Sequence, residues 1–351
     1  MSTISVAAGA EAPHPEDAAR SEHTYNVGTR KSKLALKQTE LVLTETVKAF
    51  PKYVFAVKAK DTAAGDIDKV TPFKDMPVKN IWTHELETLM VEGDLDFLVH
   101  SLKDVPTQLP SNCEIGATLA REDPRDAFVI KAGRDHCRIQ DLPSGSVVGT
   151  SSIRRTAQIA MVYPHLVVKD LRGNIGTRLN KLDAEDSPFD AIILAAAGLI
   201  RIDLSHRISQ FLDSKNGNML HAVGQGAIGI ENRSDDSKVK EIITKINHLP
   251  TFYSTIAERS LLRTIEGGCS APLGIETTWI GHDRLQLKAV VISLNGKEFA
   301  EVEMVEQVTN VQEAEEMGQT GATEILQRGA DRILAEIEAK RPTTVTDLEE
   351  T

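Results

Sequence analysis

The stretch VGTRKS at 27–32 recurs as VGTSSIRR at 148–155. In both places an apolar strand pattern ends at a Gly-Thr pair and a helical pattern begins, and a second strand follows each helix, at 53–60 and 166–171. Repeated strand–turn–helix units predict two related lobes, with a ligand site in the crevice at the carboxyl ends of the strands. The alternative is a chance likeness between two common α/β turns.

The rest of the chain first extends this pattern and then departs from it. Strands and helices alternate through 24–102 and 147–197, which is typical of α/β domains with largely parallel sheets. A helix at 252–266, two hairpin strands within 273–294 and helical sequence at 311–340 predict a separate α+β domain.

Composition argues against several classes of protein. The 351 residues carry 40 Lys and Arg against 51 Asp and Glu, and this net charge of −11 argues against general binding to nucleic acid or an acidic membrane. Aromatic residues, at 4%, are too few for a platform that stacks single-stranded nucleic acid. The longest strongly apolar run, 191–200, is half the ~20 residues that a membrane helix needs. We expect neither nucleic-acid nor membrane partners.

Cysteine and histidine usage indicates the compartment. The three cysteines, Cys113, Cys137 and Cys269, form no CxxC pair, and the sequence has no HxxxH or HExxH pattern. This usage favours a reducing cytoplasm and predicts neither a disulfide framework nor a metal site. Residues 1–23 lack the basic start and apolar core of a secretory signal, and we expect them to form a disordered extension.

Cations gather at the predicted strand–turn–helix junctions. A helix N-terminus offers free N–H groups to an anion, and a guanidinium binds a carboxylate through two parallel hydrogen bonds. We therefore interpret the group as an anion-binding cleft; the alternative is a solvated charged surface. The arginines are Arg30, Arg154, Arg155, Arg172, Arg178 and Arg201.

Two further segments carry candidate chemistry. In HSLKDVP, at 100–106, Asp104 follows a buried strand and would project at the cleft mouth, where it can stabilise positive charge or relay a proton. The alternative is a helix cap or a surface ion pair. In EGGCSAP, at 266–272, two glycines let a bulky group approach Cys269. The alternative is that Cys269 is a small hydrophobic residue buried in the core.

Together these motifs resemble the porphobilinogen deaminase family, whose members are also called hydroxymethylbilane synthases. The resemblance runs from Val27 to Gly274 and continues more weakly to the C-terminus. It is carried, in the family's order, by GTRKSKLAL, HELE, HSLKDVPT, REDPRDAF, VVGTSSIRR, LRGNIGTRL, AAAGLIR, AVGQGAIGIE, AERSLLR and EGGCSAPLG.

The resemblance implies a transferase of tetrapyrrole and haem biosynthesis; separately, we expect a monomer. Such enzymes condense four porphobilinogen molecules head to tail with loss of ammonia, and then hydrolyse linear hydroxymethylbilane from a dipyrromethane cofactor. By resemblance, a thioether joins the cofactor to Cys269, and Asp104 is the catalytic residue. The expected ligands of the pyrrole carboxylates are Arg30, Ser32, Ser101, Lys103, Thr150, Ser152, Arg154, Arg155, Arg172, Asn174, Arg178, Arg201 and Gln225.

The fold implied by the resemblance is α/β, with two periplasmic-binding-protein-like lobes around a central cleft and a smaller C-terminal α+β domain. Lobe 1 would be discontinuous, because the AVGQGAIGIE strand returns to it. The expected bounds are an extension at 1–23, lobe 1 at 24–122 and 219–246, lobe 2 at 123–218, the cofactor-carrying domain at 247–340 and a tail at 341–351.

The segment 61–84 departs from the family's usual pattern. The sequence PVKN at 77–80 replaces its usual Gly and Lys, His84 replaces a frequent Lys, and Trp82 stands where Phe is common. A loop this long inside a compact domain is usually a functional lid or a disordered segment. We expect a lid that closes over the site, with Lys79 and Trp82 as candidate lid contacts.

Two other functions fit parts of the pattern. A non-catalytic, two-lobed anion-binding protein would share the lobes but has no use for Asp104 and Cys269 together. A transferase for phosphorylated substrates would need a metal or a P-loop, and no GxxxxGK[ST] motif is present.

Overall fold

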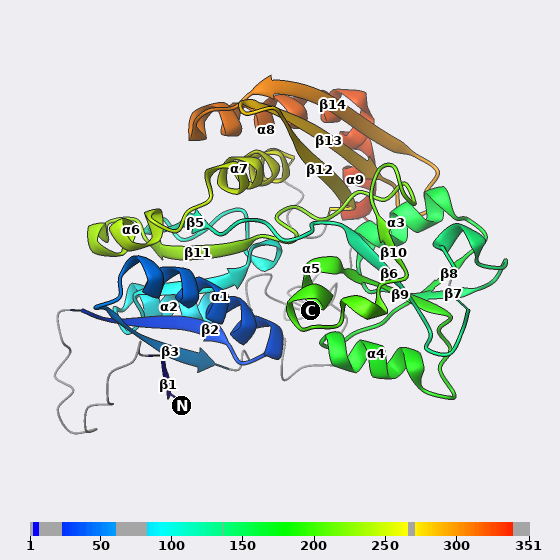
Figure 1. The fold of residues 1–351 in the computed structure, drawn as a ribbon. Coiled ribbons are helices and arrows are strands. Elements are labelled where there is room, and N and C mark those ends of the chain that lie inside the picture. Colours follow the sequence, from blue (N-terminus) through cyan, green and yellow to red (C-terminus); the bar gives the residue numbers. More distant parts are fainter. Residues whose placement is uncertain (1–2, 7–22, 61–82, 136, 266–270, 340–351) are drawn as a thin grey trace, which may run out of the picture.

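The computed structural model describes residues 3–6, 23–60, 83–135, 137–265 and 271–339, which form two α/β lobes and a smaller α+β domain (Figure 1). The sheet of lobe 1 has a parallel centre, in which β2 pairs with β3 and β4, and antiparallel pairs at both edges. In spatial order its strands are β1 (Thr3–Val6), β3 (Val54–Lys60), β2 (Thr24–Arg30), β4 (Phe97–Ser101), β11 (Ile228–Arg233) and β5 (Cys113–Thr118).

Lobe 2 repeats this plan with five strands. Strand β7 runs parallel to β8 and β9, whereas β6 and β10 pair antiparallel. In spatial order the strands are β10 (Gln210–Leu212), β6 (Asp126–Ile130), β9 (Ala191–Ala195), β7 (Val147–Gly149) and β8 (Val167–Lys169). The expected largely parallel sheets are therefore mixed sheets, because strands that return across the lobes arrive in the opposite direction.

The predicted repeat is confirmed at both Gly-Thr turns. Strand β2 ends at Arg30, and Ser32 caps the following helix by accepting a hydrogen bond from the Ala35 N–H at 3.3 Å. Strand β7 ends at Gly149, and Ser152 caps the next helix in the same way. Serine side chains satisfy N–H groups that the first helical turn leaves unpaired.

Helices cover the two sheets and bury their apolar faces. Phe55 and Phe97 lie fully buried in lobe 1 in an edge-to-face contact, with ring centroids 6.4 Å apart. The helices of lobe 1 are α1 (Lys33–Ala49), α2 (His84–Val91) and α6 (Ser237–Thr244), and those of lobe 2 are α3 (Ile153–Val162), α4 (Ile175–Asp183) and α5 (Ala196–Arg201). Short helical turns are η3 (Leu102–Asp104), η4 (Ile139–Asp141) and η5 (Ser205–Arg207).

The last domain is an antiparallel sheet packed against helices, as expected. The structure adds one strand, β14, whose exposed Glu301 and Glu303 alternate with buried apolar residues. The expected single helical stretch is broken at Gly329, where φ is 105°. The elements are α7 (Leu249–Thr264), β12 (Leu273–Ile280), β13 (Arg284–Ile292), β14 (Phe299–Gln307), α8 (Val311–Ile325), η7 (Leu326–Ala330) and α9 (Asp331–Ala339).

The N-terminal segment differs from the expectation of disorder throughout 1–23. Thr3–Val6 form β1, which pairs antiparallel with β3. The edge of a sheet presents unpaired N–H and C=O groups that a further strand can satisfy.

The expected domain bounds stay a prediction. No helix of the described part of the chain is long and apolar enough to cross a membrane.

Two chain segments, 119–125 and 213–227, cross between the lobes. Arg121 on the first donates to both carboxylate oxygens of Glu258 on α7, at 2.6 and 3.0 Å. The Gly224 N–H on the second donates to the same carboxylate at 2.8 Å. One buried carboxylate of the C-terminal domain thus holds both crossings and fixes the connection between the lobes.

Helices α7 and α8 approach so closely that Gly318 has no room for a side chain. A Cβ there would lie 2.4 Å from the Ala257 carbonyl oxygen. One at Gly321 would meet side-chain atoms and no backbone, with Leu261 and Met304 nearest at 3.2 and 3.3 Å. We expect Gly318→Ala to lower the free energy of unfolding by about 1–3 kcal/mol more than Gly321→Ala, in spite of the equal gain in helix propensity. Urea unfolding of both variants measures the difference; equal stabilities would contradict the backbone contact.

Candidate active site

A cavity of about 770 Å³ lies between the two lobes. Its walls come from the start of α1, the turn after β4, the start of α4 and helix α5. Asp104 is the one carboxylate among the described residues that line it. The lining cations are Arg30, Lys31, Lys33, Lys103, Arg155, Arg172, Arg178 and Arg201.

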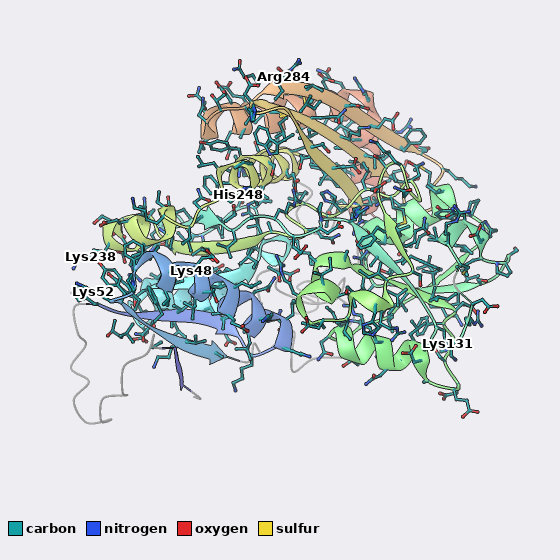
Figure 2. All side chains as sticks on the ribbon, viewed as in Figure 1. Lys48, Lys52, Lys131, Lys238, His248 and Arg284 are labelled. Carbon is teal, nitrogen blue, oxygen red and sulfur yellow. The ribbon has the colours of Figure 1, made fainter. Side chains whose placement is uncertain are left out.

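Two capped helix N-termini face this cavity. Ser32 caps α1, and Asn174 caps α4 by accepting from the Thr177 N–H at 2.9 Å; both caps line the cavity. The positive ends of the two helix dipoles therefore add to the side-chain charges. Other cations lie far from this cavity: Figure 2 shows Lys48, Lys52 and Lys238 at the outer end of lobe 1.

The turn after β4 sets the position of Asp104. Leu102 is buried, and its N–H donates to the Ala227 carbonyl at 3.0 Å, which anchors η3 between the lobes. Asp104 follows two residues later and is exposed to the cavity. Ser101 donates to Gln38 of α1 at 2.9 Å. A side cavity of about 70 Å³ joins Asp104 with Arg30, Ser32 and Ser101.

Burial disfavours the charged form of several cations in the cavity and lowers their pKa values. Burial and repulsion from Arg155 lower the pKa of Arg178 to about 10, and burial lowers the pKa of Arg201 to about 10. Burial also lowers the pKa of Lys103, although Asp104 opposes the shift. Anionic groups that enter the cavity would relieve this strain, because they pair with charges that have lost water.

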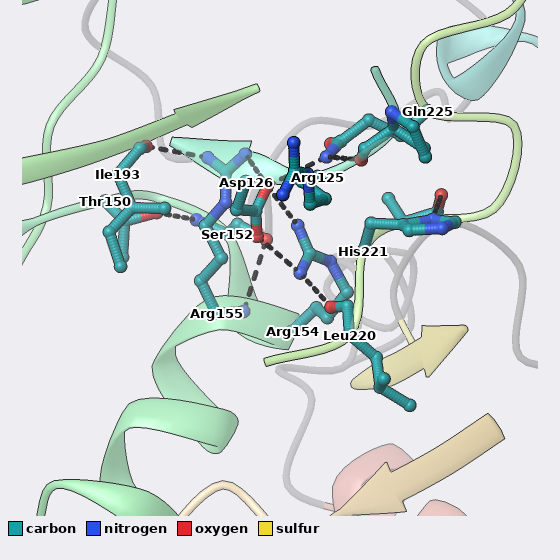
Figure 3. A network of polar contacts seen from close by, with 12 residues as sticks. Arg125, Asp126, Thr150, Ser152, Arg154, Arg155, Ile193, Leu220, His221 and Gln225 are labelled. Carbon is teal, nitrogen blue, oxygen red and sulfur yellow. Dashed lines mark hydrogen bonds and ion pairs between the residues drawn. The ribbon is translucent and has the colours of Figure 1, made fainter. Parts of the chain in front are cut away.

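A second cluster lies behind the cavity and is centred on Asp126, the fully buried first residue of β6 (Figure 3). Arg154 donates to both of its oxygens, at 2.8 and 3.3 Å, and Arg155 donates to one at 2.7 Å. Gln225 donates to Asp126 at 2.9 Å. Burial opposes ionisation of Asp126, but the two guanidiniums hold its pKa well below the usual range.

The structure brings nine of the predicted carboxylate ligands to the cavity and leaves four outside its lining. The nine are Arg30, Ser32, Ser101, Lys103, Arg155, Arg172, Asn174, Arg178 and Arg201. Arg154 instead binds Asp126 and the Leu220 carbonyl, and Gln225 binds Asp126 and the Pro124 carbonyl. Ser152 caps α3, and the Thr150 hydroxyl accepts from the Ser152 N–H at 3.2 Å. Ligand binding by these four stays a prediction.

Sequence reasoning missed Lys31, Lys33 and Asp126. The two lysines stand inside the quoted GTRKSK motif, so their position beside Arg30 was a usable signal. Asp126 stands inside the quoted REDPRDAF motif, but nothing in that motif indicates that this acid is buried and pairs with arginines far along the chain. The predicted Lys79, Trp82 and Cys269 lie outside the described residues.

The donors of the cavity fit an anionic group such as a pyrrole that carries carboxylates. The Nε atoms of Arg155 and Arg201 are buried and have no hydrogen-bond partner among the described residues. Both side chains are less than 10% exposed and both line the cavity. An unmade bond of a buried charged donor costs free energy, which an acceptor on a bound ligand would recover.

Comparison with known proteins gives consistent matches along the chain. Residues 25–241 match the family model "Porphobilinogen deaminase, dipyromethane cofactor binding domain", and residues 252–327 match "Porphobilinogen deaminase, C-terminal domain". The chain is 48% identical to porphobilinogen deaminase of Neurospora crassa over 320 residues, which cover 89% of this chain and 94% of the relative. It is 43% identical to the porphobilinogen deaminase of Schizosaccharomyces pombe over 321 residues, with the same coverage.

Among solved structures, the chain is similar to the periplasmic VFT2 domain of Bordetella pertussis BvgS, with 14% identity and a TM-score of 0.36. That match covers 68% of this chain and 92% of the other. The family assignment rests on the sequence matches, which span both lobes and the C-terminal domain. The chain belongs to the porphobilinogen deaminase family.

Proposed function

We propose that the cavity between the lobes is where this chain condenses porphobilinogen into linear hydroxymethylbilane, with Asp104 as the catalytic carboxylate and Cys269 as the attachment point of dipyrromethane. The observation that carries the proposal is that, among the described residues, eight cations and one carboxylate, that of Asp104, line the same cavity. Such a site suits a ligand that carries several carboxylates and develops positive charge at one point.

The cations bind and orient the substrate. Each pyrrole ring carries an acetate and a propionate, and guanidiniums such as Arg155 and Arg201 offer buried donors to them. The bound dipyrromethane supplies the primer on which the first pyrrole is added. Leu34, Ile175 and Leu194 give the cavity an apolar wall against which ring faces can pack.

Asp104 performs the electrostatic and proton-transfer work. When the aminomethyl C–N bond of porphobilinogen breaks, its electron pair leaves with ammonia and the substrate becomes a cation. A fixed carboxylate stabilises that charge as it forms. The same carboxylate can accept the proton that a pyrrole carbon releases as the new C–C bond forms, and can pass it to ammonia. The surrounding cations repel the substrate cation, so Asp104 is the group that favours this step.

The monomeric state and the cytoplasmic location are part of the same proposal. The cytoplasm is supported by the sparse cysteines; Cys113 is buried, and its burial together with nearby Glu231 and Glu87 raises its pKa to about 11. A buried thiol with a raised pKa packs as a small apolar side chain.

The first prediction concerns Cys269. The denatured wild-type chain should carry an added mass equal to dipyrromethane, and Cys269→Ser should lack it and lose turnover, because the thioether cannot form. Intact mass spectrometry measures the adduct, with Cys137→Ser as the matched control that keeps it. An unmodified chain that makes hydroxymethylbilane would contradict the proposal and favour a different primer.

The second prediction concerns Asp104→Asn. This change keeps the shape and removes the charge, so we expect turnover to fall by at least about 100-fold while the cofactor mass and the circular dichroism are retained. Glu45→Gln, on the exposed face of α1, is the control and should keep normal turnover. Near-normal rates of Asp104→Asn would remove this residue from the mechanism.

The third prediction compares an arginine of the cavity with an arginine on the surface. Arg155→Gln should reduce the fraction of chains that carry the cofactor, because a buried donor for a pyrrole carboxylate and a partner of Asp126 are both lost. Arg138→Gln removes an exposed arginine that, among the described residues, forms an ion pair only with Asp141, and this variant should load normally. Equal cofactor fractions in the two variants would count against carboxylate binding at Arg155.

A further inference from the structure

Helix α7 of the C-terminal domain packs next to β5 of lobe 1 (Figure 1). Its Arg259 is less than 10% exposed and is not among the described residues that line the cavity. The guanidinium donates to the Val105 carbonyl at 2.9 Å and to the Pro106 carbonyl at 2.6 Å. These two residues directly follow Asp104 in the chain. A buried arginine outside the cavity therefore holds the turn that carries the carboxylate of the cavity.

This contact supplies donors to a turn that has few of its own. The short helix η3 ends at Asp104, and within the described part of the chain no backbone N–H donates to the carbonyls of Val105 or Pro106. Val105 is buried, so its carbonyl would cost free energy if it were left unpaired. The planar guanidinium of Arg259 binds both carbonyls at once, a geometry that a lysine ammonium does not reproduce.

The same helix reaches this turn by a second route. A Cβ on Gly224 would lie 3.3 Å from the carbonyl carbon of Leu102 and from the nitrogen of Lys103, so segment 213–227 packs directly against the backbone of η3. The Gly224 N–H donates to Glu258, the residue before Arg259. Two consecutive residues of α7 thus fix the turn, Arg259 directly and Glu258 through Gly224.

Arg263, one turn later on α7, has a different role. It pairs with Glu315 of α8 and so connects two helices of the C-terminal domain, and its side chain is 34% exposed. Beyond Thr264, the last residue of α7, the sequence runs directly into EGGC at 266–269. The helix that holds the turn of Asp104 is therefore also the helix that precedes Cys269 in the chain.

We propose that Arg259 is a positioning residue, which fixes the carboxylate of Asp104 relative to α7 by holding the carbonyls of Val105 and Pro106. The inference rests on the proposed function, which makes Asp104 the catalytic carboxylate and Cys269 the attachment point. Arg259 acts through the turn and binds no substrate. Because a displacement of about 1 Å can slow a reaction about 100-fold, loss of this anchor should affect the rate of the reaction more than substrate binding.

The experiment compares Arg259→Gln, Arg259→Lys and Arg263→Gln, with each rate expressed per cofactor-loaded chain as counted by intact mass. We expect Arg259→Gln to lower kcat at least about 10-fold and to leave KM for porphobilinogen within about two-fold, because the carboxylate shifts while the cations of the cavity stay in place. Arg259→Lys can still donate to one carbonyl, so its kcat should lie between those of Arg259→Gln and the wild type. Arg263→Gln is the matched control on the same helix and should keep the wild-type kcat.

A double-mutant cycle with Asp104→Asn tests whether Arg259 acts through Asp104. If it does, adding Arg259→Gln to Asp104→Asn should change the remaining rate by less than about two-fold, because there is no carboxylate left to position. A residue that only supports the fold would slow both backgrounds by the same factor, and that result would overturn the proposal. Mass spectra of single-turnover reactions measure these low rates. If Arg259→Gln does not fold, Arg259→Lys replaces it in the cycle.

The same set of variants separates this inference from the proposed function. A wild-type kcat in Arg259→Gln, together with the expected loss in Asp104→Asn, would overturn the positioning role of Arg259 alone. Near-normal turnover of Asp104→Asn would instead overturn the catalytic role that the proposed function gives to Asp104.

Discussion

The carboxylate of Asp126 is the constraint on which the cleft depends. It begins β6, accepts from two arginines of α3, and accepts from Gln225 on the chain segment that returns to lobe 1. The group is fully buried and two guanidiniums compensate its charge, so loss of either arginine would leave that buried charge with weaker compensation. Asp126 therefore sets the position of Arg155 in the cavity and holds the returning segment through Gln225, while Glu258 holds both crossings between the lobes.

The cavity has an excess of positive charge, whereas the chain as a whole is negative. The protein carries a net charge of −11, yet eight cations and one carboxylate line the cavity. Burial lowers the pKa values of Arg178 and Arg201 to about 10, and repulsion from Arg155 adds to the shift of Arg178, so the cleft stores unfavourable electrostatic energy until an anion binds. A bound polycarboxylate relieves this unfavourable energy, and the relief contributes to its affinity. Salt screens the acidic residues of the outer surface, so they do not oppose binding in the cavity.

Much of the local structure could be predicted from sequence because its causes are local. The caps at Ser32 and Ser152 and the strand–turn–helix units follow from residue type and spacing. Three features escaped: the added strand β14, the mixed direction of the sheets, and the pairing of Thr3–Val6 with β3. Each depends on which segment meets which in space, and that information lies in contacts between residues far apart in the chain.

The sequence by itself determined the family, the candidate cations and the candidate pair Asp104 and Cys269, because these are carried by motifs of contiguous residues. Tertiary structure decided which cations share the cavity. Arg154 and Arg155 are neighbours in sequence, yet Arg155 lines the cavity and Arg154 turns to Asp126 and Leu220. Both arginines donate to Asp126, and what separates them is the second acceptor, which is the Leu220 carbonyl for Arg154 and the Ile193 carbonyl for Arg155. Desolvation forces each side chain to find such an acceptor, and these carbonyls take their places only in the folded lobe.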